Sequence, residues 1–392
     1  MTASVTASAT APAPASAAPP AFLRYDPGIE SVPPGEAETA RALVDTLCGI
    51  GRATDRPGAP TLRSVHAKSH GLLAGELEVL PGLAAPYAQG LCAAPGRYPV
   101  VLRLSTTPGD LLDDGVSTPR GLALKVIGVP GERLEGPEAP GPEDSGSEAA
   151  GTQNFVLISG PVAPVPDPGT FLRTLRLFAL TTDRIEGVKR ALSTALRGVQ
   201  AAVVAATGGP SAALAAFGGQ PATHILGESF FSQVAIRWGD HVAKVAVVPV
   251  SPELTALTNR PLPADGGPNA LRASVLTHFR DRGGVWELRA QLCTELAAMP
   301  VEDPAAVWPE AASPYVAVAR ITVPPQCAWS PARAAAVDEG MAFDPWHGLA
   351  AHRPLGTIMR VRRTVYAALR ASRAERSGRA IEEPRAAPDL PD

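Results

Sequence analysis

The sequence has little cysteine, almost no net charge and no long apolar run. Its 392 residues include four cysteines, none in a CxxC pair, so neither a disulfide framework nor a thiolate zinc site is indicated. A reducing, cytoplasmic setting is therefore expected. Lys and Arg number 35 against 38 Asp and Glu, which excludes a polybasic nucleic-acid binder. No stretch of eighteen unbroken apolar residues occurs, so no membrane span is expected.

Glycine and proline are abundant, at 37 and 42 residues, and they gather in particular segments. Residues 1–21 are almost entirely Ala, Pro, Ser and Thr, which predicts a disordered arm. Residues 131–151 are acidic and rich in Gly and Pro, which predicts a flexible insertion. Residues 374–392 are charged and end in prolines, which predicts a disordered tail. Residues 22–373 are expected to form a single domain.

Within that domain the apolar pattern indicates an α+β fold. Many short β-rich runs spread over about 200 residues favour an antiparallel barrel with helices segregated around it. Strands are predicted at Gly71–Leu80, Tyr98–Ser105, Leu122–Val129, Phe155–Ser159, Phe230–Arg237, Val242–Val250, Trp286–Cys293 and Val316–Val323. Helices are predicted at Pro34–Ile50, Thr170–Ala205 and Arg360–Arg370.

His66 is the histidine with the most suggestive surroundings, in the run Arg-Ser-Val-His-Ala-Lys at residues 63–68. His70 lies four residues further on, but Gly71 and the strand pattern after it argue against a metal-binding helix. Taken alone, His66 fits a hydrogen-bonded histidine at a strand edge equally well.

Arg362 and Tyr366 are four residues apart on the predicted C-terminal helix, so they share one face. A guanidinium beside a phenol favours the phenolate, which is an oxygen ligand for ferric iron. The spacing alone also permits a second interpretation. In that case the arginines of this helix form a solvated basic face and Tyr366 packs on the core.

Several stretches in a fixed order resemble heme catalases, especially the small catalase-related peroxidases and the catalase-like proteins that metabolise hydroperoxides. They are the run at residues 63–68, Arg-Leu-Ser-Thr at 103–106, Pro-Arg-Gly-Leu-Ala-Leu-Lys at 119–125, residues 151–158, and Arg362-x-x-x-Tyr366 with Arg373 seven residues on. The resemblance covers most of residues 22–373. It implies a catalase-like β-barrel, heme b with its iron, and a small peroxide as substrate.

The resemblance also implies a role for each matching residue. His66 is the distal acid and base, Ser105 orients its ring, and Tyr366 is the axial ligand of the iron. Arg362 keeps Tyr366 ionised. Arg373 assists Arg362 in this role. Binding of the heme propionates falls to the guanidinium groups of Arg63 and Arg103.

The sequence departs from the family pattern at three places. The distal asparagine position holds Thr152, with Asn154 two residues on as the other candidate. Residues 161–165 contain no aromatic residue to stack on a heme, and Thr364 stands at the middle of the proximal motif. We therefore expect an oxidoreductase that cleaves the O–O bond of hydrogen peroxide or of an organic (lipid) hydroperoxide. The alternative is a catalase-fold protein without heme that serves as a binding or scaffolding module. A homo-oligomer is possible.

Overall fold

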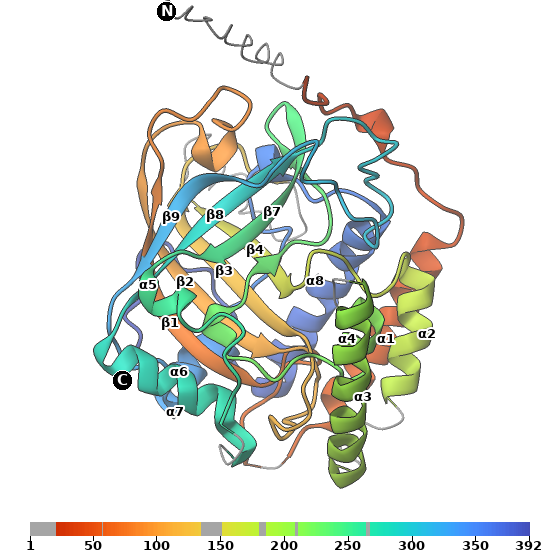
Figure 1. The fold of residues 1–392 in the computed structure, drawn as a ribbon, viewed down its shortest axis with the longest axis vertical. Coiled ribbons are helices and arrows are strands. Elements are labelled where there is room, and N and C mark those ends of the chain that lie inside the picture. The colour runs from red at the N-terminus through yellow and green to blue at the C-terminus, as the bar shows by residue number, and fades with distance from the viewer. Residues whose placement is uncertain (1–20, 57, 135–150, 180–185, 208–210, 264–266) are drawn as a thin grey trace, which may run out of the picture.

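A computed structural model of the protein describes residues 21–56, 58–134, 151–179, 186–207, 211–263 and 267–392, and its centre is an antiparallel β-barrel (Figure 1). Eight strands close the barrel in the order β1-β2-β3-β4-β5-β7-β8-β9, with β9 pairing back onto β1 and β6 added beside β7. The strands are β1 (Ser69–Val79), β2 (Arg97–Thr106), β3 (Arg120–Val129), β4 (Gly151–Ser159), β5 (Phe230–Phe231), β6 (Ile236–Trp238), β7 (His241–Pro249), β8 (Gly284–Leu292) and β9 (Val316–Val323). The predicted α+β fold with an antiparallel barrel is confirmed.

The barrel interior is filled by the alternate residues of each strand. On β2, Leu102 and Leu104 point into the main hydrophobic core, whereas Arg103 and Ser105 are on the outer face. β3 and β4 follow the same alternation. The outer face of these strands is therefore polar at selected positions and needs a cover.

Helices provide that cover and gather mainly on one side of the barrel (Figure 1). α1 packs against α8 and α2 through a second apolar cluster that includes Leu43, Leu47, Leu172 and Val365. The helices are α1 (Glu36–Ala53), α2 (Pro168–Ala179), α3 (Glu186–Thr207), α4 (Ala212–Ala216), α5 (Pro252–Thr255), α6 (Ala270–Asp281), α7 (Pro331–Ala334) and α8 (Thr357–Ser377). A wide π-type turn follows α7 at Ala335–Glu339.

Two predicted elements are divided in the structure. The predicted helix Thr170–Ala205 is found as α2 and α3, with residues 180–185 between them outside the described residues. The predicted strand Phe230–Arg237 is found as β5 and β6. Between these strands Gln233 has a φ of 61°, a left-handed conformation that ends the extended run.

The predicted disordered tail is wrong for the residues after 374. α8 continues to Ser377, and the chain beyond it packs on the molecule with Ile381 and Leu390 each 7% exposed. The charged composition misled the prediction because Glu383 is paired with the fully buried Lys125. Residues 1–20 of the predicted arm and 135–150 of the predicted insertion lie outside the described residues.

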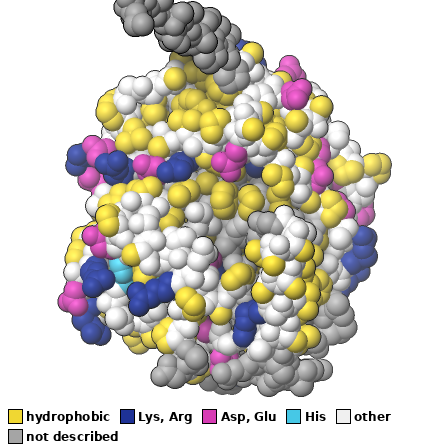
Figure 2. Space-filling view, in the orientation of Figure 1, with side chains coloured by type: hydrophobic (Ala, Val, Ile, Leu, Met, Phe, Trp, Pro, Cys, Tyr) yellow, Lys and Arg dark blue, Asp and Glu magenta, His cyan; other side chains and the backbone are white. Residues whose placement is uncertain are grey.

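Figure 2 shows basic and acidic side chains in small mixed groups on the face it draws. None of the helices in the described residues combines the length and apolar character needed to cross a membrane.

Candidate active site

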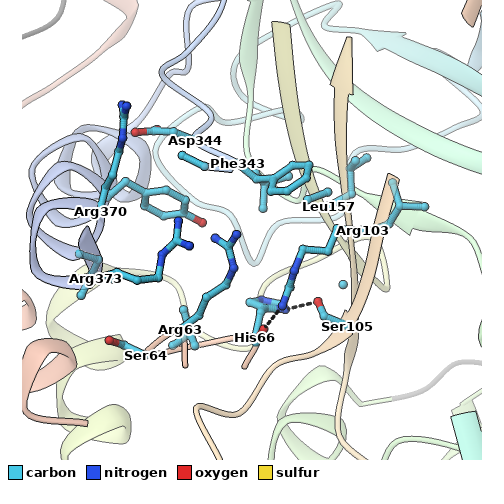
Figure 3. A pocket seen from close by; sticks show the side chains of 18 of the residues that line it. Arg63, Ser64, His66, Arg103, Ser105, Leu157, Phe343, Asp344, Arg370 and Arg373 are labelled. Atoms are coloured by element: carbon cyan, nitrogen blue, oxygen red, sulfur yellow. Dashed lines mark hydrogen bonds between the residues drawn. The ribbon is translucent and has the colours of Figure 1, made fainter. Parts of the chain in front are cut away.

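One cavity lies over the outer face of β2, β3 and β4, beside residues 342–344, with α8 as its opposite wall (Figure 3). The space between these walls is about 800 Å³ when the open solvent at its mouth is included. Its lining comes from five parts of the chain: residues 63–66, β2, the pair β3 and β4, residues 342–344, and α8.

His66 and Ser105 form one side of this cavity. The Nδ1 atom of His66 lies 3.0 Å from Ser105 Oγ, a hydrogen-bond distance that fixes the ring (Figure 3). The backbone of His66 has a φ of 53°, an uncommon conformation for a residue with a side chain. It is held because its N–H donates to the carbonyl oxygen of Thr107 (2.9 Å) and its carbonyl oxygen accepts from Arg103 (2.7 Å).

Gly121 makes room for the histidine ring. It lies opposite Ser105 in the register of β2 and β3, on the same outer face. A Cβ atom at this position would stand 2.6 Å from Cε1 and 2.7 Å from Nδ1 of His66, well inside van der Waals contact. The ring can therefore lie over the sheet only because residue 121 has no side chain.

Tyr366 lines the opposite side of the cavity, on α8, and Arg362 supports it from outside the lining. Both have helical backbone, and the four-residue spacing places them one turn apart. The Nη2 atom of Arg362 donates to the phenol oxygen of Tyr366 at 2.6 Å. The guanidinium carbon lies 5.0 Å from the centre of the phenol ring.

Arg63, Arg103 and Arg373 bring three cations to one wall of the cavity. In Figure 3 the guanidinium groups of Arg63 and Arg373 point toward each other. Arg103 Nε donates to Asp338 Oδ1 at 2.6 Å, and Ser69 Oγ donates to the other oxygen at 2.6 Å. The wide turn at Ala335–Glu339 exposes backbone carbonyl oxygens toward these groups. Those of Val337 and Met341 accept from Arg63, and those of Asp338, Glu339 and Met341 accept from Arg373.

The concentration of positive charge sets the protonation of the site. Burial, then Arg103, Arg362 and Arg63, lowers the pKa of His66 to about 3, so the ring is neutral at pH 7. Burial and then Arg103 lower the pKa of Arg373 to about 10. Burial raises the pKa of Asp338, but Arg103 and Arg63 outweigh it, and the pKa lies below its ordinary value.

Thr152 and Asn154 are placed away from His66. Both are buried on the outer face of β4 but neither lines the cavity. Thr152 Oγ1 donates to Glu383 at 3.1 Å, and Asn154 Nδ2 donates to the carbonyl oxygen of Asp344 at 3.1 Å. Val156, next on the same face of the strand, contributes to the lining instead.

Three residues of the site were not singled out from the sequence: Gly121, Asp338 and Phe343. Gly121 lies in the stretch 119–125 that resembles catalases, but no role was predicted for it. Phe343 supplies an aromatic ring to the cavity, 5.8 Å from the guanidinium carbon of Arg63, although residues 161–165 supply none. Nothing in the sequence marks Asp338, because its importance depends on arginines distant in the chain.

The residues present fit a heme group by three observations. Tyr366 and His66 line the same cavity from opposite sides. Gly121 leaves the space that the histidine ring uses. The Nε atom of Arg63 is buried without a hydrogen-bond partner, as expected for a cation that awaits an anion. Within the described residues no group of three or more His, Cys, Asp or Glu side chains is arranged to hold a bare metal ion.

Comparison with known proteins gives structural matches. No protein-family model and no curated protein sequence matches the chain. Among solved structures, a fungal catalase aligns with a TM-score of 0.53 at 18% identity, covering 79% of this chain and 58% of the catalase. Catalase A from Saccharomyces cerevisiae aligns with a TM-score of 0.52 at 18% identity, covering 90% and 67%. A bacterial catalase aligns with a TM-score of 0.52 at 15% identity, covering 83% and 61%.

These matches agree with the barrel and its helices. The chain spans about three fifths of the length of the fungal and bacterial catalases that it resembles. At this level of sequence identity the likeness concerns the fold. The protein therefore has the catalase fold, with a cavity between the barrel and the helices lined by His66 on one side and Tyr366 on the other.

Proposed function

We propose that the protein is a heme b-dependent oxidoreductase of the catalase family that cleaves the O–O bond of hydrogen peroxide or of an organic hydroperoxide. One observation carries the proposal. The hydrogen-bonded pair His66–Ser105 lines the same cavity as Tyr366, which lies 300 residues after His66 in the sequence and accepts a hydrogen bond from Arg362. The fold supports the assignment, since the three solved structures named above are catalases.

In this proposal the arginines and Tyr366 hold the cofactor. Tyr366 would hold the iron through its phenol oxygen, and Arg362 would orient that oxygen through the 2.6 Å hydrogen bond. Arg63, Arg103 and Arg373 receive the propionates, for which guanidinium groups are suited. When bound, heme would supply redox-active iron for cleavage of the O–O bond.

His66 would move the proton. With its Nδ1 proton donated to Ser105, Nε2 carries a lone pair that faces the cavity and can accept the proton of a bound hydroperoxide. The same atom then returns the proton to the departing oxygen, which leaves as water or an alcohol. The low pKa of about 3 ensures that the ring starts neutral.

The lining favours a hydroperoxide with an apolar body. Val156 and Leu369 line the cavity together with Ala123, Ala342 and Phe343. This preference is tested by measuring kcat/KM for hydrogen peroxide and for cumene hydroperoxide. We expect the larger kcat/KM for cumene hydroperoxide. A larger kcat/KM for hydrogen peroxide would refute the preference.

The axial role of Tyr366 is tested with hemin. The wild type reconstituted with hemin should bind one equivalent and show the absorption of a ferric phenolate. Tyr366→Phe keeps the ring but removes the oxygen, so the phenolate spectrum should disappear. Tyr98→Phe is the matched control, because Tyr98 lies on β2 but does not line the cavity. A Tyr366→Phe variant with an unchanged spectrum would sink the axial assignment.

The role of His66 is tested by peroxide consumption. His66→Ala should retain hemin, since the residue holds no part of it, and should lose ~10²–10⁴-fold in rate. His278→Ala is the control because His278 is on α6, hydrogen-bonded to the carbonyl oxygen of Gly283 and outside the cavity. Equal rates for the two variants would contradict the proposed role.

A second candidate function is a binding or scaffolding module without heme. The observation in its favour is that Arg103 and Arg373 already have partners within the chain, Asp338 and backbone carbonyl oxygens. Protein that stays colourless with excess hemin would support this candidate and refute the first.

The four cysteines are free in the structure. This supports a reducing, cytoplasmic setting as part of the proposal. Sedimentation of the purified protein tests the proposed homo-oligomer.

A further inference from the structure

The C-terminal segment, residues 379–392, joins no strand or helix and packs against the chain that leads to the cavity wall at Phe343. Near its start the N–H of Glu382 donates to the carbonyl oxygen of Gly340. Near its end Leu390 packs with Val337 and Phe343 in an apolar cluster. Arg333 then binds the carbonyl oxygens of residues 390 and 391 and the side chain of residue 392. The segment therefore covers residues 337–343, which include the cavity wall at Phe343.

The carboxylate of Glu383 is inserted between these two anchors into a polar site. Oε2 accepts from the ammonium of Lys125 and from Thr152 Oγ1 at 3.1 Å. Oε1 lies 3.2 Å from Nδ1 of His347, which donates in the tautomer that carries its proton there. The three partners come from β3, from β4 and from the loop before α8, so the fold builds the site and Glu383 only occupies it.

The site continues the cavity along the outer face of the sheet. Ala123 lines the cavity, and Lys125 is the next residue of β3 on that face. On β4, Val156 lines the cavity and Thr152 lies further along the same face. Phe343 stands between the two, with Lys125 Nζ 5.5 Å from the centre of its ring on one side.

Lys125 requires an anion at this place. Its side chain is 0% exposed, and an unpaired ammonium in such surroundings is strongly unfavourable. Burial lowers the pKa of Lys125 while Glu383 raises it. The pKa of Glu383 itself is about 2 despite its burial, because His347 and Lys125 favour the charged form. The site is thus selective for a negatively charged oxygen ligand.

We propose that Lys125, Thr152 and His347 form a carboxylate-binding site at the end of the cavity, in which Glu383 is an exchangeable resident, and that the ligand is an organic acid with an apolar chain. The ligand's carboxylate replaces Glu383, and its chain extends past Phe343 into the apolar cavity. The identification of that acid as a hydroperoxide substrate rests on the proposed function, whereas the carboxylate site itself does not.

The carboxylate site is tested without hemin, on the full chain, by rescue with formate. Glu383→Ala removes the resident carboxylate, so formate should raise its Tm and bind about tenfold or more tightly than it binds the wild type. Glu382→Ala is the matched control, because Glu382 is the exposed neighbouring acid. It should respond to formate as the wild type does. Glu383→Gln keeps the shape of the side chain and provides a folded comparison if the alanine variant is unstable; it too should gain formate binding.

The ligand class is tested by calorimetric titration with dodecanoate and dodecanol, which share an apolar chain. Glu383→Ala should bind dodecanoate about tenfold or more tightly than dodecanol. Lys125→Met in the same chain should abolish that difference, because it removes the cation.

Equal binding of dodecanoate and dodecanol by Glu383→Ala would overturn the proposal. So would a formate-induced rise in the Tm of Glu383→Ala that is no larger than the rise in Glu382→Ala. A wild-type protein that does not bind heme would refute the proposed function. The formate and dodecanoate experiments would still test the carboxylate site, because neither uses hemin.

Discussion

Gly121→Ala changes a single methyl group at the centre of the proposed site. The new Cβ would stand 2.6 Å from Cε1 of His66 and 3.2 Å from Ser105 Oγ, against an ordinary contact of about 3.5–4.0 Å. The ring must therefore shift by about 1 Å, which stretches its 3.0 Å contact with Ser105 beyond hydrogen-bond range. Overpacking and the lost hydrogen bond together predict a stability loss of about 2–4 kcal/mol.

Urea unfolding of the protein without hemin measures that loss, and peroxide consumption by the hemin-loaded protein measures the effect on chemistry. A shift of this size in a catalytic group predicts a rate about 100-fold lower. Gly49→Ala is the matched control: its Cβ would meet nothing within 4 Å, and it lies in α1, so it should gain about 0.5–1 kcal/mol and leave the rate unchanged. If Gly121→Ala has the same unfolding free energy and the same rate of peroxide consumption as the wild type, the placement of His66 over β3 is wrong.

Two further predictions concern stability. The pKa of His66 is lowered from 6.5 to about 3, so folding favours the neutral ring and this contribution is lost as pH falls below 6.5. Between pH 6.5 and 5 the wild type without hemin should lose up to about 2 kcal/mol more than His66→Gln, and equal losses in urea unfolding would contradict the pKa. Arg360 binds Glu30, Glu36 and Glu302 at 2.8–3.0 Å in a partly buried network. Arg360→Met should therefore lower the free energy of unfolding by about 3–5 kcal/mol. Arg363→Met is the control, because Arg363 is exposed on the same helix. A similarly small loss in both variants would show that the network contributes little to stability.

Much of the fold was predictable because strands in this chain alternate clearly. β9 was predicted with its observed bounds, Val316–Val323, and β2 and β7 differ from the prediction by one residue at each end. The division of the predicted strand Phe230–Arg237 was not predicted, because it depends on the left-handed backbone at Gln233. The tail was wrongly predicted because a charged segment was taken as solvated, although Lys125 binds its Glu383.

The site was predictable where the sequence itself brings residues together, or where the family resemblance does. Arg362 and Tyr366 are one helical turn apart, so their contact follows from the helix. The meeting of His66 and Ser105 depended on the resemblance. Asp338 could not be found, since its role appears only when the turn after α7 reaches arginines from β2 and the loop before β1.

The central claim is that Tyr366 binds heme iron within this cavity. The most direct measurement is the resonance Raman spectrum of the hemin-loaded protein, in which an iron-bound phenolate gives characteristic tyrosinate vibrations. We predict these vibrations in the wild type and in Tyr98→Phe, and their absence in Tyr366→Phe. A wild-type protein that binds hemin without them, or a Tyr366→Phe protein that retains them, would contradict the account.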